Sequence, residues 1–70
     1  MTDSDIKTAF RVAYETLMEN KDWENTIAYF DILYENMHKK MDQYPDNRLM
    51  SWLMGSVFGY IAEEARKEKQ

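Results

Sequence analysis

The sequence predicts an all-α protein, a compact three-helix bundle whose helices run up, down and up. Apolar residues recur every three or four positions along the chain, which is the period of an amphipathic helix. No segment alternates between apolar and polar residues as a half-buried strand does. Two short polar segments separate three helix-like stretches, and short connections make successive helices antiparallel neighbours.

The first helix is expected over residues 4–19. The preceding residues, TDSD at positions 2–5, offer several capping oxygens and carry charges that suit the positive end of a helix. Val12 lies outside the apolar stripe of this helix, so we expect it to face the solvent. The expected core stripe is Ile6, Ala9, Phe10, Ala13, Tyr14 and Leu17.

The second helix is expected over residues 22–43, with Asp22 as its N-cap after a short connection. It should end near residue 43 because Pro45 disfavours helical geometry at Tyr44. Tyr29 and Ile32 point away from the apolar stripe, which a monomer does not require. The expected core stripe is Trp23, Ile27, Phe30, Leu33, Tyr34, Met37 and Met41.

The third helix is expected over residues 46–67, beginning at or near Asp46 and ending in a basic segment. From Leu49 to Ala62 it has fourteen residues without a charge, although 31% of the whole chain is charged. This run is too short to span a bilayer and has the length of a buried core helix. Trp52 lies beyond its broad apolar face.

Three small residues follow one side of this third helix at intervals of four, namely Ser51, Gly55 and Gly59. Glycine inside a helix costs about 0.5–1 kcal/mol relative to alanine, so two glycines in one helix need a reason. A close approach of another backbone or a large ring is such a reason. Either Ala9, Ala13 or a ring of the second helix packs there within one chain, or a second copy or partner does.

The length of the chain favours association. Seventy residues, 1–70, form a single helical domain whose own core supplies only about 3–5 kcal/mol of stability. The chain has no cysteine for disulfides and only one histidine for a structural zinc site. We therefore expect a homo-oligomer, with a dimer favoured, or a complex with another protein, formed through the third helix and the outer face of the second. The interface candidates are Val12, Tyr29, Ile32, Ser51, Trp52, Gly55 and Gly59.

No set of residues in the sequence dictates a chemistry, so we expect neither an enzyme nor a cofactor. The lone histidine has no serine and acid partners at recognisable spacing, and both glycines lie inside a helix rather than in a phosphate-binding loop. Glu35 and His38 have the i, i+3 spacing of ligands in di-iron helical bundles. A dimeric metal-binding bundle is therefore an alternative, although the ligand set is incomplete and we assign no metal ligand.

The net charge of −4 argues against nucleic acid as a partner. Lys39, Lys40 and Arg48 form the one small basic cluster that the sequence suggests, and it leaves a small transcriptional or nucleoid regulator as a second alternative. The first ten residues are polar and acidic, without the apolar core of a signal peptide. We expect a cytoplasmic protein that does not bind membranes.

The leading hypothesis from the sequence is a small non-catalytic protein–protein interaction module, a homo-oligomeric adaptor or an inhibitor of a larger protein. Its basis is the surplus of apolar residues, since tyrosine and tryptophan are the residue types that anchor such contacts. In its length, acidity and lack of cysteine the chain resembles the accessory proteins of bacteriophages and mobile elements. This resemblance is one of style and implies an accessory role.

Overall fold

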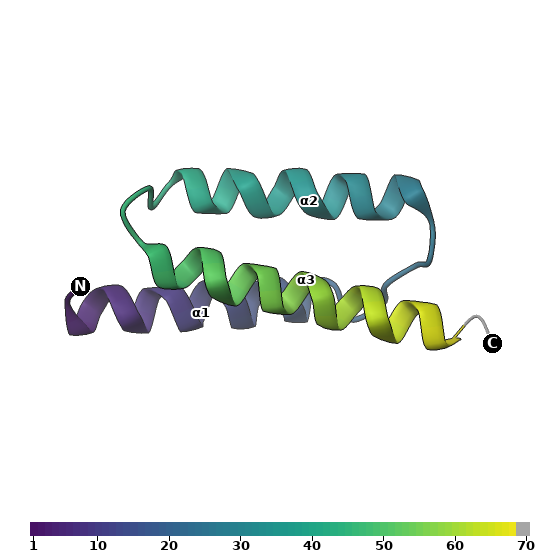
Figure 1. Ribbon diagram of the computed structural model, residues 1–70, viewed down its shortest axis with the longest axis horizontal. Helices are drawn as coiled ribbons and strands as arrows, with labels where there is room; N and C mark the ends of the chain where they lie inside the picture. The colour runs from purple at the N-terminus through teal and green to yellow at the C-terminus, as the bar shows by residue number, and fades with distance from the viewer. Residues whose placement is uncertain (69–70) are drawn as a thin grey trace.

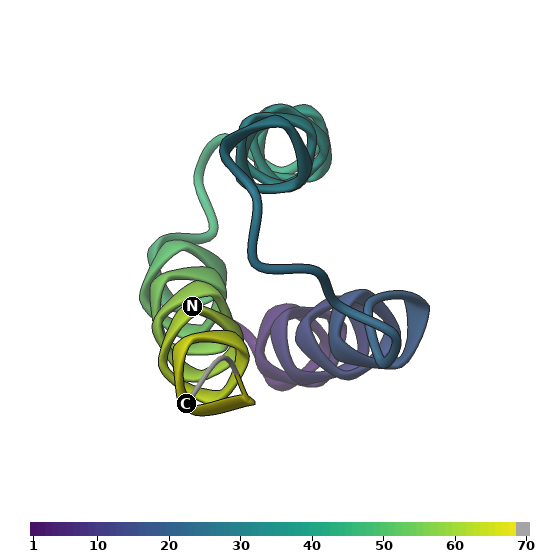
Figure 2. The same cartoon turned by 90° about the vertical axis from the view of Figure 1, so that its right-hand side faces the viewer.

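A computed structural model of the chain describes residues 1–68. Its helices are α1 (Asp3–Glu19), α2 (Ile27–Asp42) and α3 (Arg48–Glu68). Figure 1 shows α1 and α3 running in the same direction, with α2 returning between them in sequence. The view along the helices in Figure 2 shows α3 beside both α1 and α2. The predicted all-α three-helix bundle is confirmed, and α3 is the helix on which the other two pack.

The core lies along the side of α3 that faces α1 and α2. Its largest fully buried side chains are Leu33 from α2 and three residues of α3, two of which are methionines. Methionine side chains are flexible and can fill irregular spaces. They therefore suit a core in which α1 and α2 pack on α3 to different extents. The buried cluster consists of Ala9, Val12, Leu33, Met37, Met50, Met54 and Ile61.

The orientation of α1 differs from the prediction. Val12 is only 6% exposed and belongs to the core, so its expected place on the solvent face is wrong. Phe10 and Tyr14, expected in the core, are 56% and 63% exposed. The pattern assigned the large residues to the buried stripe. The core is instead filled by long side chains of α3, so the side of α1 that meets them carries small ones. The buried residues of α1 are Ala9, Val12, Ala13 and Thr16.

The second helix begins at Ile27, five residues later than expected. Thr26 is the N-cap in place of Asp22, and its hydroxyl accepts a hydrogen bond from the backbone N–H of Tyr29 at 3.1 Å. Trp23 therefore lies in the connection between α1 and α2, where its ring meets that of Tyr60 edge-on at 6.2 Å. The expected core stripe is wrong at two further positions, because Ile27 and Tyr34 are 83% and 57% exposed.

Long polar side chains connect α2 to α1, whose backbones touch least among the three helix pairs. The ammonium of Lys40 donates to Thr16 Oγ1 at 3.0 Å and to Glu19 Oε1 at 2.6 Å. In the first turn of α2, the hydroxyl of Tyr29 donates to Asn20 Oδ1 at 2.8 Å. Burial, with a smaller contribution from the charge of Glu24, raises the pKa of Tyr29. The hydroxyl is therefore held as a neutral donor.

Side-chain caps fix the beginnings of α1 and α3. Thr2 and Asp5 form a capping box, one of the arrangements that the residues TDSD offered. The hydrogen bonds from Thr2 lower the pKa of the Asp5 carboxyl. Asn47, which is buried, accepts from the Met50 N–H at 3.1 Å and donates to the Asp5 carbonyl at 2.9 Å. One amide thus caps α3 and ties its start to the first turn of α1.

We expect Asn47→Ala to lower the free energy of unfolding by about 1 kcal/mol, because it removes the cap of α3. Chemical denaturation followed by circular dichroism measures this change. Asn36→Ala is the matched control, since Asn36 is exposed in the interior of α2 and its replacement should change stability by less than about 0.5 kcal/mol. Equal effects of the two substitutions would contradict a capping role for Asn47.

Candidate protein-interaction surface

The strip of small residues on α3 faces outward. Ser51, Gly55 and Gly59 are exposed. Among the described residues, no atom beyond the adjoining backbone lies within 4 Å of a Cβ placed at either glycine. The alternative in which another part of the same chain packs closely against the strip is therefore wrong. The glycines leave open space on the surface of the folded chain.

Trp52 stands beside this strip with 75% of its surface exposed. Together with Ser51, Gly55 and Ser56 it lines a shallow hollow of about 410 Å³. The hydroxyl of Ser56 donates to the Trp52 carbonyl within the helix at 3.2 Å, so it is already engaged. The hollow thus presents an indole ring and glycine backbone to the solvent, and the prediction that Trp52 lies outside the core holds.

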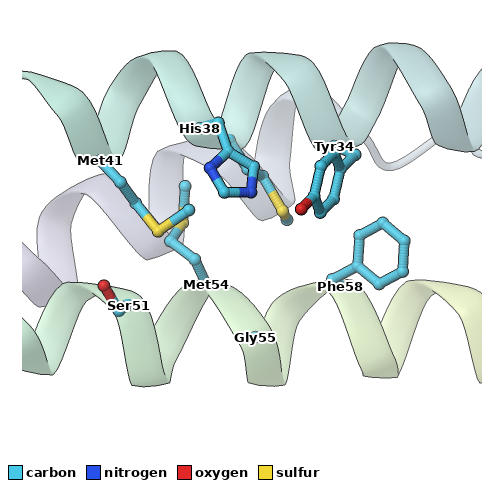
Figure 3. A pocket seen from close by; sticks show the side chains of 8 residues that line it. Tyr34, His38, Met41, Ser51, Met54, Gly55 and Phe58 are labelled. Atoms are coloured by element: carbon cyan, nitrogen blue, oxygen red, sulfur yellow. The ribbon is translucent and has the colours of Figure 1, made fainter.

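A groove of about 380 Å³ runs between α2 and α3 on the other side of the strip. Figure 3 shows the rings of Tyr34 and His38 projecting from α2 toward α3, with Phe58 facing Tyr34 across the groove. The Tyr34 ring lies 4.3 Å from that of His38 and 6.4 Å from that of Phe58, between centroids. The groove is lined by Tyr34, Met37, His38, Met41, Ser51, Met54, Gly55 and Phe58.

Ser51 and Gly55 line both the groove and the hollow beside Trp52. The two depressions therefore adjoin each other along this part of α3. The groove has methionine and aromatic walls, and no charge occurs on α3 between Leu49 and Ala62. A partner entering this region would meet apolar surface and backbone.

The edge of α1 that borders α3 extends the apolar surface. Leu17 lines a hollow of about 340 Å³ together with Met18, Lys21, Trp23 and Tyr60, which places this edge next to α3. Phe10 lies seven residues before Leu17 and Tyr14 lies one turn after Phe10, so both belong to the same side of α1. Sequence reasoning missed these two residues as surface candidates because it assigned them to the core.

The two candidates on α2 lie away from the strip. Ile32 is 58% exposed, but it precedes Tyr34 by two positions and so lies roughly 160° from it around the helix. Tyr29 is partly buried and its hydroxyl is bonded to Asn20. The structure therefore does not join Tyr29 and Ile32 to Ser51, Trp52, Gly55 and Gly59 as one surface, and Val12 lies in the core.

We call the exposed part of α3 and the aromatic residues that border it the α3 surface. A large aromatic side chain has about 150–250 Å² of surface, and the five members here are 52–75% exposed, so they present on the order of 600 Å². This total is distributed around α3 rather than gathered in one patch, because Tyr60 lies about 140° from Gly55 around the helix. The α3 surface consists of Phe10, Tyr14, Tyr34, Ser51, Trp52, Gly55, Ser56, Gly59 and Tyr60.

Charged residues stand only at the two ends of this surface on α3. Arg48 begins the helix and forms no ion pair with any residue from 1 to 67. Glu63 follows the apolar run at the other end, with its carboxylate 3.7 Å from Lys67. Glu64 lies 3.1 Å from the same ammonium, and these contacts raise the pKa of Lys67. The surface thus has a cation at one end and, at the other, two carboxylates that share one lysine.

The structure places the residues that the sequence offered for metal or nucleic acid as follows. Within the described part of the chain, no three His, Cys, Asp or Glu side chains gather where they could hold a metal ion. His38 packs against the Tyr34 ring instead. Lys40 is directed to Glu19 and Thr16 rather than into a basic cluster with Lys39 and Arg48. No helix in residues 1–68 has the length and apolarity to cross a bilayer.

Comparisons with protein-family models, with characterised proteins and with solved structures found no match for this chain. Within residues 1–68, every buried side-chain nitrogen or oxygen has a hydrogen-bond partner. Two of them hold helices together, because Thr16 accepts from Lys40 of α2 and Asn47 donates to the Asp5 carbonyl of α1. The exposed α3 surface is the feature of this fold that its own packing leaves unexplained.

Proposed function

We propose that this protein is a small non-catalytic protein–protein interaction module that binds through the α3 surface. The observation that carries the proposal is the exposure of Trp52 beside a glycine-lined hollow on α3, with four further exposed aromatic side chains on α3 and on the two helices packed against it. Such residues anchor protein interfaces because they bury much area with little loss of rotamer freedom. The module acts by covering apolar surface, as an adaptor or an inhibitor does, and fits an accessory role.

The size of the surface supports this proposal. Burial of about 600 Å² of apolar surface is worth about 15 kcal/mol at 25 cal/mol per Å². Association costs about 4–15 kcal/mol in lost translational and rotational freedom. Burial of the whole surface is therefore comparable with the upper end of that cost.

Site-specific photo-cross-linking tests the proposal. A benzophenone amino acid in place of Phe10 lies on the α3 surface, whereas the same group in place of Glu35 lies on the exposed outer side of α2. We expect the Phe10 probe to cross-link a protein in cells of the native host, either another copy or a different protein. An excess of the unlabelled chain should compete, and the Glu35 probe should yield no such product. Equal labelling from both positions would refute the proposal.

A further inference from the structure

We infer that the occupant of the α3 surface is a second copy of this chain, with the two α3 helices crossing antiparallel near Gly55 and Ser56. This inference rests on the proposed function and names its partner. A two-fold axis makes each copy present the same surface to the other, so the surface must complement itself. The sizes and charges along α3 satisfy that condition in the antiparallel direction.

Size complementarity is the first step. Positions 48, 52, 55, 59 and 62 are spaced alternately by four and three, so they lie on one side of α3. A two-fold axis between positions 55 and 56 places Trp52 of each copy opposite Gly59 of the other. The open space above Gly59 is then occupied by an indole ring that is 75% exposed in the single chain. Two glycines at the crossing allow the helix backbones to approach closely.

Charge complementarity is the second step. The same axis places Arg48 of each copy opposite Glu63 of the other. Arg48 has no ion pair among residues 1–67 of its own chain, and Glu63 has a long one of 3.7 Å to Lys67. A parallel pair would instead place Arg48 against Arg48 and Glu63 against Glu63, which is repulsive. It would also stack Trp52 on Trp52 and leave the glycines facing each other across a void. Both effects favour the antiparallel pair.

The area is the third step. A stable interface buries about 800 Å² per partner, of which about 56–65% is apolar, or about 500 Å². The aromatic residues of the α3 surface present on the order of 600 Å². Burial of all of this area would supply the apolar half of a standard dimer interface. Tyr34 borders the strip across the groove between α2 and α3, whereas Phe10 and Tyr14 lie on the edge of α1 that is next to Tyr60.

Single cysteines test the arrangement without background, because the chain has no cysteine. Arg48→Cys and Glu63→Cys proteins would be mixed and treated with a short bismaleimide. An antiparallel crossing yields the mixed dimer linked between positions 48 and 63 and little of either self-linked product. Self-linked products from each variant alone, without the mixed one, would overturn the antiparallel arrangement. Glu35→Cys is the control, since it is exposed on the outer side of α2.

Sedimentation equilibrium of the unmodified chain accompanies this experiment. Interfaces of this area have dissociation constants in the micromolar range or below, so we expect a dimer at about 100 µM. Trp52→Ala should weaken it at least tenfold and leave the helical content unchanged, because Trp52 is exposed. A monomer at that concentration would refute the inference that a second copy of the chain occupies the α3 surface. The proposed function would then still stand if the Phe10 probe cross-links a different protein, and would fall with it if that probe labels nothing.

Discussion

Leu33→Ala should lower the free energy of unfolding by about 2–5 kcal/mol, enough to unfold most of the protein at room temperature. Leu33 is 1% exposed and is the largest fully buried side chain of α2. Its truncation removes buried methyl groups and leaves a cavity between α2 and α3. A single core in a chain of this length supplies only about 3–5 kcal/mol in total. The loss is therefore comparable with the whole stability of the domain.

The neighbouring residue provides the control for this prediction. Ile32 is 58% exposed, so Ile32→Ala should change the free energy of unfolding by no more than about 0.5 kcal/mol. Thermal and urea denaturation, followed by circular dichroism at equal protein concentration, compare the two variants. A folded Leu33→Ala protein with unchanged stability would show that α2 is not held to α3 by this side chain, and that the core described above is incorrect.

The helical period of the apolar residues made the fold class predictable, because a period of three to four is independent of which side of a helix is buried. The ends of the helices were predictable where a local signal acts alone. Pro45 stops α2 near Asp42, and α1 begins at Asp3, one residue before its expected start, although the sequence did not show which of four candidate residues caps it. The start of α2 was not predictable, because Asp22 and Thr26 are both residue types that cap helices. The choice between them depends on Trp23, whose ring contacts the distant Tyr60.

The rotation of α1 could not be read from hydrophobicity. A pattern ranks Phe10 and Tyr14 above Ala9 and Ala13, yet the space between α1 and α3 is filled from α3 by methionines and Ile61. Small residues are then the ones that fit on α1, and the large aromatic residues remain outside. The volume available in a core depends on all three helices together, and a stripe on one helix carries no information about it.

The candidate surface was predictable only in part, because the pattern along one helix does not show how much space the other helices leave in the core. Trp52 and the small residues of α3 were singled out because they depart from the pattern of their own helix, and the structure places them together. Phe10 and Tyr14 follow the apolar pattern of α1, so nothing at their own positions indicated exposure. Only the total number of large residues, which is greater than three short helices can bury, indicated that some had to lie outside. Ile32 departs from its pattern but lies on a different side of the molecule from the strip.

Replacement of both glycines of α3 by alanine should separate folding from association. Each Gly→Ala change stabilises a helix interior by about 0.5–1 kcal/mol, and the space above Gly55 and Gly59 accepts the added methyl groups. At concentrations where the chain is monomeric, we expect Gly55→Ala/Gly59→Ala to raise the free energy of unfolding by about 1–2 kcal/mol. The same methyl groups would hold two crossing α3 helices apart, so the dimer should dissociate at least tenfold more readily.

Urea denaturation at low concentration and sedimentation equilibrium at high concentration measure the two effects on the same pair of proteins. Glu35→Ala is the control, because Glu35 is exposed on the outer side of α2 and its replacement should change stability by less than about 0.5 kcal/mol and leave association unchanged. Opposite signs for folding and association are the result that only an intermolecular role for the glycines produces. A variant that is more stable and associates as strongly as the original chain would show that the helices cross elsewhere, since a glycine kept for close contact cannot be replaced without cost at that contact.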